Sequence, residues 1–89
     1  MQSFEALYRV PVTHRLVPVR SCSHGGRTPS TYWEHEEYDT SGRLVARYKS
    51  FAQRGPNGDV TRGSWRKINP SGRLIGQGSP MPSSLAEAA

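Results

Sequence analysis

A chain of 89 residues, of which 34% are hydrophobic, is long enough for one small domain with a thin core. Its formal net charge of +5 favours an acidic partner, such as nucleic acid, an anionic membrane or an acidic protein surface. The single cysteine, Cys22, excludes an internal disulfide framework and fits a reducing compartment. The sequence has neither a signal-peptide pattern nor an apolar run long enough to span a membrane, so we expect a cytoplasmic protein without membrane contact.

Residues 1–30 are predicted to form an extended N-terminal arm and a loop. Met1–Leu7 is weakly patterned and fits either a frayed start or a single helical turn. Residues 10–12 and 16–19 have β-branched side chains around prolines. Proline lacks the N–H that a central strand needs, so these residues predict edge strands or extended segments. Ser21–Ser30 contains two adjacent glycines and predicts a flexible loop.

A six-residue phrase occurs twice in the second half of the chain. The first residue is Asp or Asn, whose side chain can accept hydrogen bonds from the backbone of a turn. The fourth is glycine, which tolerates a positive φ. Each copy therefore predicts the tip of a β-hairpin built on a type I turn. The two copies are Asp39-Thr40-Ser41-Gly42-Arg43-Leu44 and Asn69-Pro70-Ser71-Gly72-Arg73-Leu74.

Four strands are predicted around these turns, with a third turn signal at residues 56–59. They span residues 31–38, 43–52, 60–68 and 73–77. The predicted fold is all-β: a small antiparallel four-stranded meander built from two similar hairpins, with extended Pro-containing N-terminal segments. Residues 31–77 form the sheet domain, and 78–89 are expected to be a disordered tail.

The first turn, taken literally, also predicts a register. Asp39 faces Arg43, and the pairs then continue as Tyr38–Leu44, Glu36–Ala46, Glu34–Tyr48 and Tyr32–Ser50. Because side chains alternate between the two faces of a strand, even-numbered residues would form the core face. The odd-numbered face would then present Trp33, Lys49 and Phe51 as a binding surface.

Tyr38–Leu44 resembles the core of the YD repeat, found in the large β-rich shells of Rhs-type and teneurin-type proteins. The likeness extends partly to Ile68–Leu74, where Ile-Asn replaces Tyr-Asp. The resemblance implies successive hairpins, and a chain of this length cannot build such a shell.

The sequence contains a few residues of the types that catalyse reactions or bind metals. Cys22 and His24 lie close in sequence, but nothing in their Gly-rich surroundings fixes an imidazole as the base for a thiol. Four side chains could bind a soft metal: His14, Cys22, His24 and His35. Their spacing in the sequence matches no known zinc-binding pattern. The acidic cluster is expected to face the neighbouring basic strand; it comprises Glu34, Glu36, Glu37 and Asp39. We therefore predict no enzyme activity, no metal and no cofactor.

The remaining signal is Arg and Lys interleaved with aromatic residues. The candidate partner-binding residues are Trp33, Arg47, Lys49, Phe51, Trp65 and Lys67. The first hypothesis is a small accessory or regulatory protein that binds a macromolecule, most readily a protein, through this basic-aromatic sheet face. The alternative is a nucleic-acid-binding β module for single-stranded RNA or DNA. Burial in the core remains open for both tryptophans, and the oligomeric state is not predicted.

Overall fold

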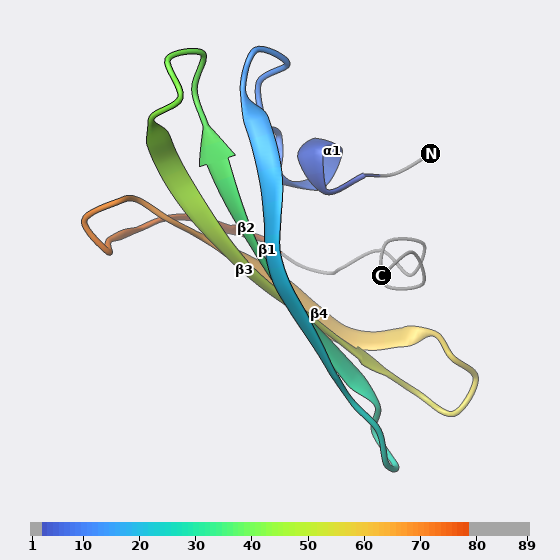
Figure 1. Ribbon diagram of the computed structural model, residues 1–89. Coiled ribbons are helices and arrows are strands. Elements are labelled where there is room, and N and C mark those ends of the chain that lie inside the picture. The colour runs from blue at the N-terminus through green and yellow to red at the C-terminus, as the bar shows by residue number, and fades with distance from the viewer. Residues whose placement is uncertain (1–2, 79–89) are drawn as a thin grey trace.

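The computed structural model describes residues 3–78. The strands form one antiparallel sheet in the order β1-β2-β3-β4-β5, so each pairs with its neighbours in the chain (Figure 1). The all-β prediction is confirmed, but the sheet has five strands and not four. The elements are α1 (Phe4–Tyr8), β1 (Arg15–His24), β2 (Ser30–Tyr38), β3 (Leu44–Arg54), β4 (Val60–Ile68) and β5 (Leu74–Gly78).

The fifth strand comes from the segment that was predicted to be an arm and a loop. β1 pairs with β2 from Arg15 opposite Tyr38 to His24 opposite Ser30. Pro18 lies in this edge strand, where a missing N–H is tolerated. Residues 21–24 belong to the strand although they lack apolar alternation, because backbone pairing does not require it. The connection between β1 and β2 is therefore limited to residues 25–29.

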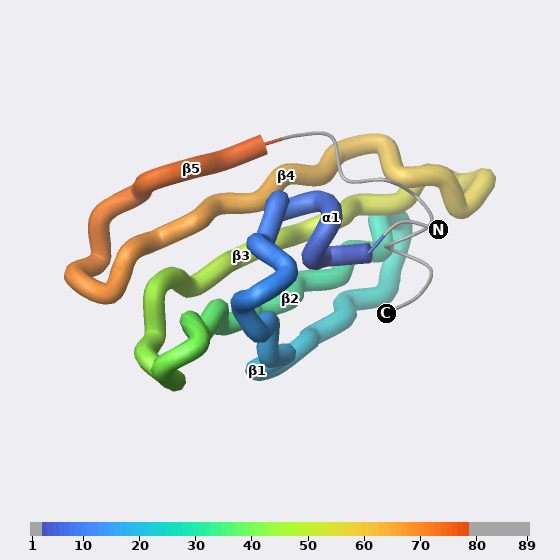
Figure 2. The backbone as a smooth tube through the Cα atoms, turned by 90° about the horizontal axis from the view of Figure 1, so that it is seen from above, coloured from blue at the N-terminus to red at the C-terminus, as the bar shows by residue number. Residues whose placement is uncertain are grey.

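The helix α1 is a single short segment that lies against one face of the sheet (Figure 2). The hydroxyl of Ser3 caps its start by accepting a hydrogen bond from the backbone N–H of Ala6 at 3.1 Å. Arg9 ends it in the left-handed region, with φ of 58°. This helix divides the sheet into a covered face, which lies beneath α1, and an open face on the opposite side.

Both predicted hairpin turns are present. In the first, the Asp39 carboxylate accepts hydrogen bonds from the backbone N–H groups of Ser41 and Arg43, at 2.9 and 3.0 Å. The Asn69 side chain accepts the two equivalent bonds in the second turn. Gly42 and Gly72 have φ of 80° and 90°, as the turn chemistry predicts.

A third turn of the same build joins β3 to β4. Its glycine, Gly58, has φ of 83° and donates its N–H to the carbonyl of Gly55 at 3.0 Å. In each of the three hairpins, the strand register skips one residue just after the turn. These residues are Val45, Thr61 and Ile75. The β-hairpin repeat therefore occurs three times and not twice.

The extra residue at Val45 overturns the predicted register beyond the first pair. Tyr38 does face Leu44, but Glu37 then faces Ala46 and Glu36 faces Arg47. A shift of one residue moves every later side chain to the other face. The core face is consequently made of odd-numbered residues in β2 and even-numbered residues in β3, and the prediction of one even-numbered core face is wrong.

The covered face contains the core of the protein. Eight side chains here are nearly inaccessible to solvent: Tyr8, Trp33, His35, Glu37, Ala46, Tyr48, Ser50 and Ala52. Phe4 and Leu7 of α1 pack against both groups of buried apolar residues. The predicted tail lies outside the described residues, apart from Gly78.

We expect that Gly42→Val and Gly72→Val will each lower the free energy of unfolding by about 1 kcal/mol or more, because a side chain is strained at positive φ. Gly25→Val is the matched control, since a Cβ at either Gly25 or Gly42 would meet no atom within 4 Å and only Gly42 has positive φ. Urea unfolding measures the three variants. Equal losses at Gly25 and Gly42 would contradict the assigned turn.

Candidate functional site

The structure separates the six residues that the sequence singled out for partner binding. Trp33, Trp65 and Lys67 lie on the covered face, because Trp33 and Trp65 both pair with Ser50, and Lys67 with Tyr48. Another three, Arg47, Lys49 and Phe51, lie on the open face. The predicted surface of Trp33, Lys49 and Phe51 is therefore not formed.

Both tryptophans contribute to packing beneath and beside α1. Trp33 is 5% exposed, and its ring centre lies 5.6 Å from that of Phe4. The ring of Trp65 contacts Tyr8 edge-on at 5.3 Å. It also covers Gly78, where an added Cβ would lie only 2.6 Å from the indole nitrogen. Trp33 is thus buried in the core, and Trp65 closes the covered face over β5.

A buried carboxylate, Glu37, is the centre of the first polar network on the covered face. Glu37 is 2% exposed, accepts a hydrogen bond from the Tyr48 hydroxyl at 2.5 Å and contacts Nδ1 of His14 at 2.5 Å. The ammonium of Lys67 lies 3.9 Å away. Burial alone would raise the pKa of Glu37, but these hydrogen bonds and the nearby positive charge outweigh it, so its pKa lies below the ordinary value.

Tyr8 is the centre of the second network. Its ring stacks on Tyr48, with 4.0 Å between ring centres and 10° between planes. Its hydroxyl hydrogen-bonds with Ser50 and lies 3.3 Å from Nδ1 of His35. Burial raises the pKa of Tyr8 to about 12, although the bond to Ser50 opposes this, and burial lowers the pKa of His35. Both groups are therefore neutral at pH 7, and their hydrogen bonds fix α1 to the sheet.

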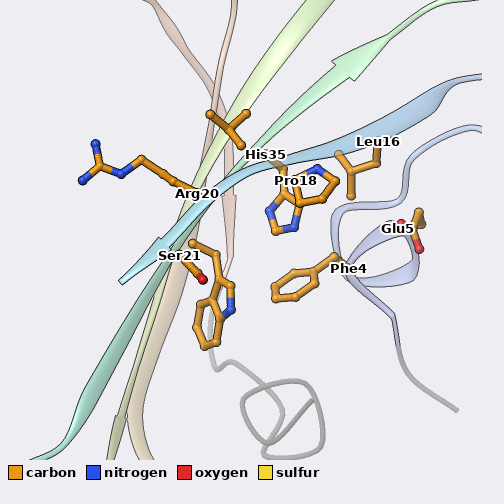
Figure 3. A pocket seen from close by; sticks show the side chains of 9 residues that line it. Phe4, Glu5, Leu16, Pro18, Arg20, Ser21 and His35 are labelled. Atoms are coloured by element: carbon orange, nitrogen blue, oxygen red, sulfur yellow. The ribbon is translucent and has the colours of Figure 1, made fainter. Parts of the chain in front are cut away.

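A cavity of about 510 Å³ opens between α1 and β1. Phe4, Leu16, Pro18 and His35 lie around it, while the guanidinium of Arg20 extends away from them (Figure 3). The Trp33 indole N–H, which is buried, has no hydrogen-bond partner among the described residues. The lining also includes Glu5, and the guanidinium of Arg20 is directed away, which makes the cavity a poor site for a phosphate or another anion.

The open face has an aromatic pair, in which Phe51 was predicted to bind a partner and Tyr32 was not. Tyr32 is 48% exposed and lies directly across from Phe51, with ring centres 5.9 Å apart and planes 25° apart. His24 approaches Tyr32 edge-on at 5.9 Å. The wrong register placed Tyr32 in the predicted core. Tyr32 shares a face with Phe51 only in the register that skips Val45.

Cations surround this pair. In the strand register, Arg20, Glu34, Lys49 and Arg66 form one row across the open face, next to the row that contains Tyr32 and Phe51. Within residues 3–78, six of the twelve Lys and Arg side chains lie on this face, against two carboxylates. These six are Arg15, Arg20, Arg47, Lys49, Arg62 and Arg66, and all are exposed.

The acidic cluster of β2 is divided between the faces. Glu36 accepts a hydrogen bond from Nε of Arg47 at 3.2 Å and one from the Tyr38 hydroxyl at 2.8 Å. It therefore pairs with the basic strand, as expected, whereas Glu37 is buried on the other face. Asp39 is confined to the turn. Only Glu34 and Glu36 lower the positive charge of the open face.

The candidate nucleophile and metal ligands are dispersed. Cys22 and His24 lie on the exposed surface of β1, with Sγ and Nε2 3.6 Å apart, and within residues 3–78 no carboxylate hydrogen-bonds to that imidazole. His14 and His35 belong to the two separate networks described above. The described residues contain no group of three or more His, Cys, Asp or Glu side chains that could hold a metal ion. Nor does that part of the chain contain a helix with the length and apolar character to cross a membrane.

Glu37→Gln is expected to lower the free energy of unfolding by about 1–3 kcal/mol at pH 7, because the hydrogen bonds of Tyr48 and His14 lose their charged partner. The pKa of Glu37 is lower in the folded protein than its ordinary value of 4.5. The stabilisation is therefore complete above pH 4.5 and is lost as the pH falls through the folded-state pKa. The difference between wild type and variant should shrink below pH 4.5 in urea unfolding.

Asp39→Asn is the control for this experiment, because Asn69 already performs the same role in an equivalent turn. We expect the control to change stability at pH 7 much less than Glu37→Gln. A constant difference between wild type and Glu37→Gln from pH 7 to pH 3 would show that the buried carboxylate is not the acid-sensitive group.

No protein-family model matches this chain, and the comparisons with curated proteins and with solved structures give no match either. The resemblance of Tyr38–Leu44 to the YD repeat therefore stays a prediction. What the chain binds must be argued from the geometry of its two faces.

Proposed function

We propose that this protein is a single-stranded nucleic-acid-binding module whose binding surface is the open face of the sheet. The observation that carries the proposal is the exposed ring of Tyr32 beside the half-buried ring of Phe51, with Lys49 and Arg66 in the adjacent row. Aromatic rings on an accessible sheet stack with unpaired bases, and neighbouring cations neutralise the phosphates. Bases inside a duplex are already stacked, so this arrangement favours a single strand.

The charge of the open face supports an acidic partner. Six cations against two carboxylates give this face most of the protein's net charge of +5. The carboxylate of Glu36 is already held by Arg47, and its side chain is only 25% exposed. A strand that crossed the sheet from β4 to β1 would meet Arg66, Lys49, Glu34 and Arg20 in turn, which are three cations and one carboxylate. Such a row tracks a phosphate backbone.

A protein partner was the first hypothesis from the sequence, and its candidate interface included both tryptophans. Tryptophan is enriched at the energetic centres of protein interfaces, but here Trp33 and Trp65 pack on the covered face. The residues that remain for an interface are Arg47, Lys49 and Phe51, which suit an acidic protein as well as a nucleic acid. The exposed aromatic stack favours the nucleic acid, and an acidic protein is the alternative that the binding experiment must exclude.

The test is fluorescence anisotropy with a labelled single-stranded RNA, the same sequence as DNA, and the corresponding duplex. We expect the single strands to bind more tightly than the duplex and the affinity to fall steeply as NaCl is raised. Lys49→Gln should reduce the slope of log affinity against log salt by about 1. Binding that is absent, or that does not depend on salt, would contradict the proposal.

Tyr32→Ala should weaken the free energy of single-strand binding by about 1–3 kcal/mol, which is the contribution of one base stacked on an aromatic ring. It should leave the thermal stability unchanged. Ile75→Ala is the matched control, because Ile75 is 49% exposed, like Tyr32, but lies on β5 away from the aromatic pair. We expect the control to bind as the wild type does. Unchanged affinity in Tyr32→Ala would show that bases do not stack on this pair.

A further inference from the structure

A hollow of about 280 Å³ lies beside Tyr32 on the β1 side of the sheet. Its polar and aromatic walls come from two strands: Cys22 faces Tyr32 across the ladder, and Arg20 faces Glu34. The ring of His24 stands edge-on to Tyr32 at the same place. The residues that line the hollow are Arg20, Cys22, His24, Tyr32, Trp33 and Glu34.

Glu34 is the unexpected member of this group. Among residues 3–78, its carboxylate makes no hydrogen bond or ion pair, although Arg20 and Lys49 are its cross-strand neighbours. The two other carboxylates of β2 are held by partners, Glu36 by Arg47 and Glu37 by His14. An unpaired carboxylate repels phosphate, so its place in the middle of the basic face needs another explanation.

We infer that this hollow selects a guanine base, with Glu34 as the residue that determines specificity; this inference rests on the proposed function. The Watson–Crick edge of guanine carries two adjacent donors, N1–H and N2–H2, beside the acceptor O6. A carboxylate has two acceptor oxygens and can receive both donors. Arg20 supplies the donor for O6, and an arginine that donates to guanine O6 or N7 is a common pairing.

The other bases lack this pattern. Adenine and cytosine each carry one amino group beside a ring nitrogen that accepts, and uracil has one N–H between two carbonyl oxygens. If adenine, cytosine or uracil lay opposite Glu34, one of its acceptor atoms would face a carboxylate oxygen, which also accepts, so no hydrogen bond could form there. The hollow therefore discriminates by charge and hydrogen bonding, while the rings of Tyr32 and His24 provide contact that every base can use.

A second hollow, of about 210 Å³, lies on the β3–β4 side of Tyr32. Phe51, Lys49, Arg66 and Ser64 line it, and no carboxylate does. A neighbouring base could stack there without selection. Tyr32 lines both hollows, so the surface fits two successive bases. Only the base over β1 and β2 is recognised by its hydrogen-bonding groups.

The test uses four labelled nonamers of uridine that have G, A, C or inosine at the centre. Wild-type protein should bind the guanine oligomer about tenfold or more tightly than the adenine and cytosine oligomers. Inosine lacks the N2 amino group and should fall between them. Equal affinities for all four would overturn the inference and leave the proposed function standing, whereas no binding to any oligomer would overturn both.

Glu34→Gln separates recognition from general affinity. The amide offers one acceptor in place of two, so the variant should lose the preference for guanine. It should also bind the adenine and cytosine oligomers at least as tightly as the wild type does, because a negative charge near the phosphates is gone. Glu36→Gln is the matched control and should keep the preference. A preference for guanine that survives in Glu34→Gln would overturn the role of this residue.

The guanine base could belong to a strand or to a free nucleotide, and competition distinguishes the two. GMP should displace the guanine nonamer at least a hundredfold less effectively than the unlabelled nonamer, because it lacks the second base and the flanking phosphates. AMP should be weaker still. GMP that competes as well as the nonamer would overturn the assignment of this site to a strand.

Discussion

One residue that the strand register skips after each of the three similar turns decides which side chains share a face. Val45, Thr61 and Ile75 occupy equivalent places, each following a turn that ends in a glycine at positive φ. Since the side-chain period of a strand is two, each extra residue reverses the faces of everything beyond it. Without the one at Val45, Tyr48 would lie on the same side as Tyr32, and Glu37 would lie opposite Val45.

The two faces consequently have different chemistry. The covered face buries Tyr48 and Ala46 against α1, and its buried carboxylate is satisfied within the protein: Glu37 contacts Tyr48, His14 and Lys67. Leaving any of these groups without a partner would be costly, because the surroundings are nearly inaccessible to water. The open face has no such cover, and its aromatic pair and cations remain available to a partner.

Local chemistry made the turns and most of the strands predictable. Asp39, Asn69 and the glycines three residues later require only their own backbone to form a turn, and the limits predicted for the third strand are those of β4. The turn at residues 56–59 was also predicted, but its likeness to the other two was missed because Gly55 stands where they have Asp or Asn.

The faces could not be predicted in the same way. A residue left unpaired between two strands depends on how the whole ladder pairs, and no residue type at Val45 marks it. For this reason Tyr32 was predicted to lie in the core and Trp33 on the binding surface, whereas in the structure Trp33 is buried and Tyr32 is exposed. The first strand was predicted only in part. Residues 16–19 were expected to form an edge strand or an extended segment, whereas the polar residues 21–24 look like a loop, although backbone pairing with β2 does not need apolar alternation.

The central claim is that the open face binds and the covered face only supports the fold. Aromatic ring resonances measured by NMR during titration with a single-stranded oligonucleotide test it most directly. The account predicts that the rings of Tyr32 and Phe51 shift and show contacts to base protons, while Tyr8, Tyr48 and Trp33 stay unchanged. Shifts confined to the covered-face rings, with Tyr32 and Phe51 unaffected, would contradict it.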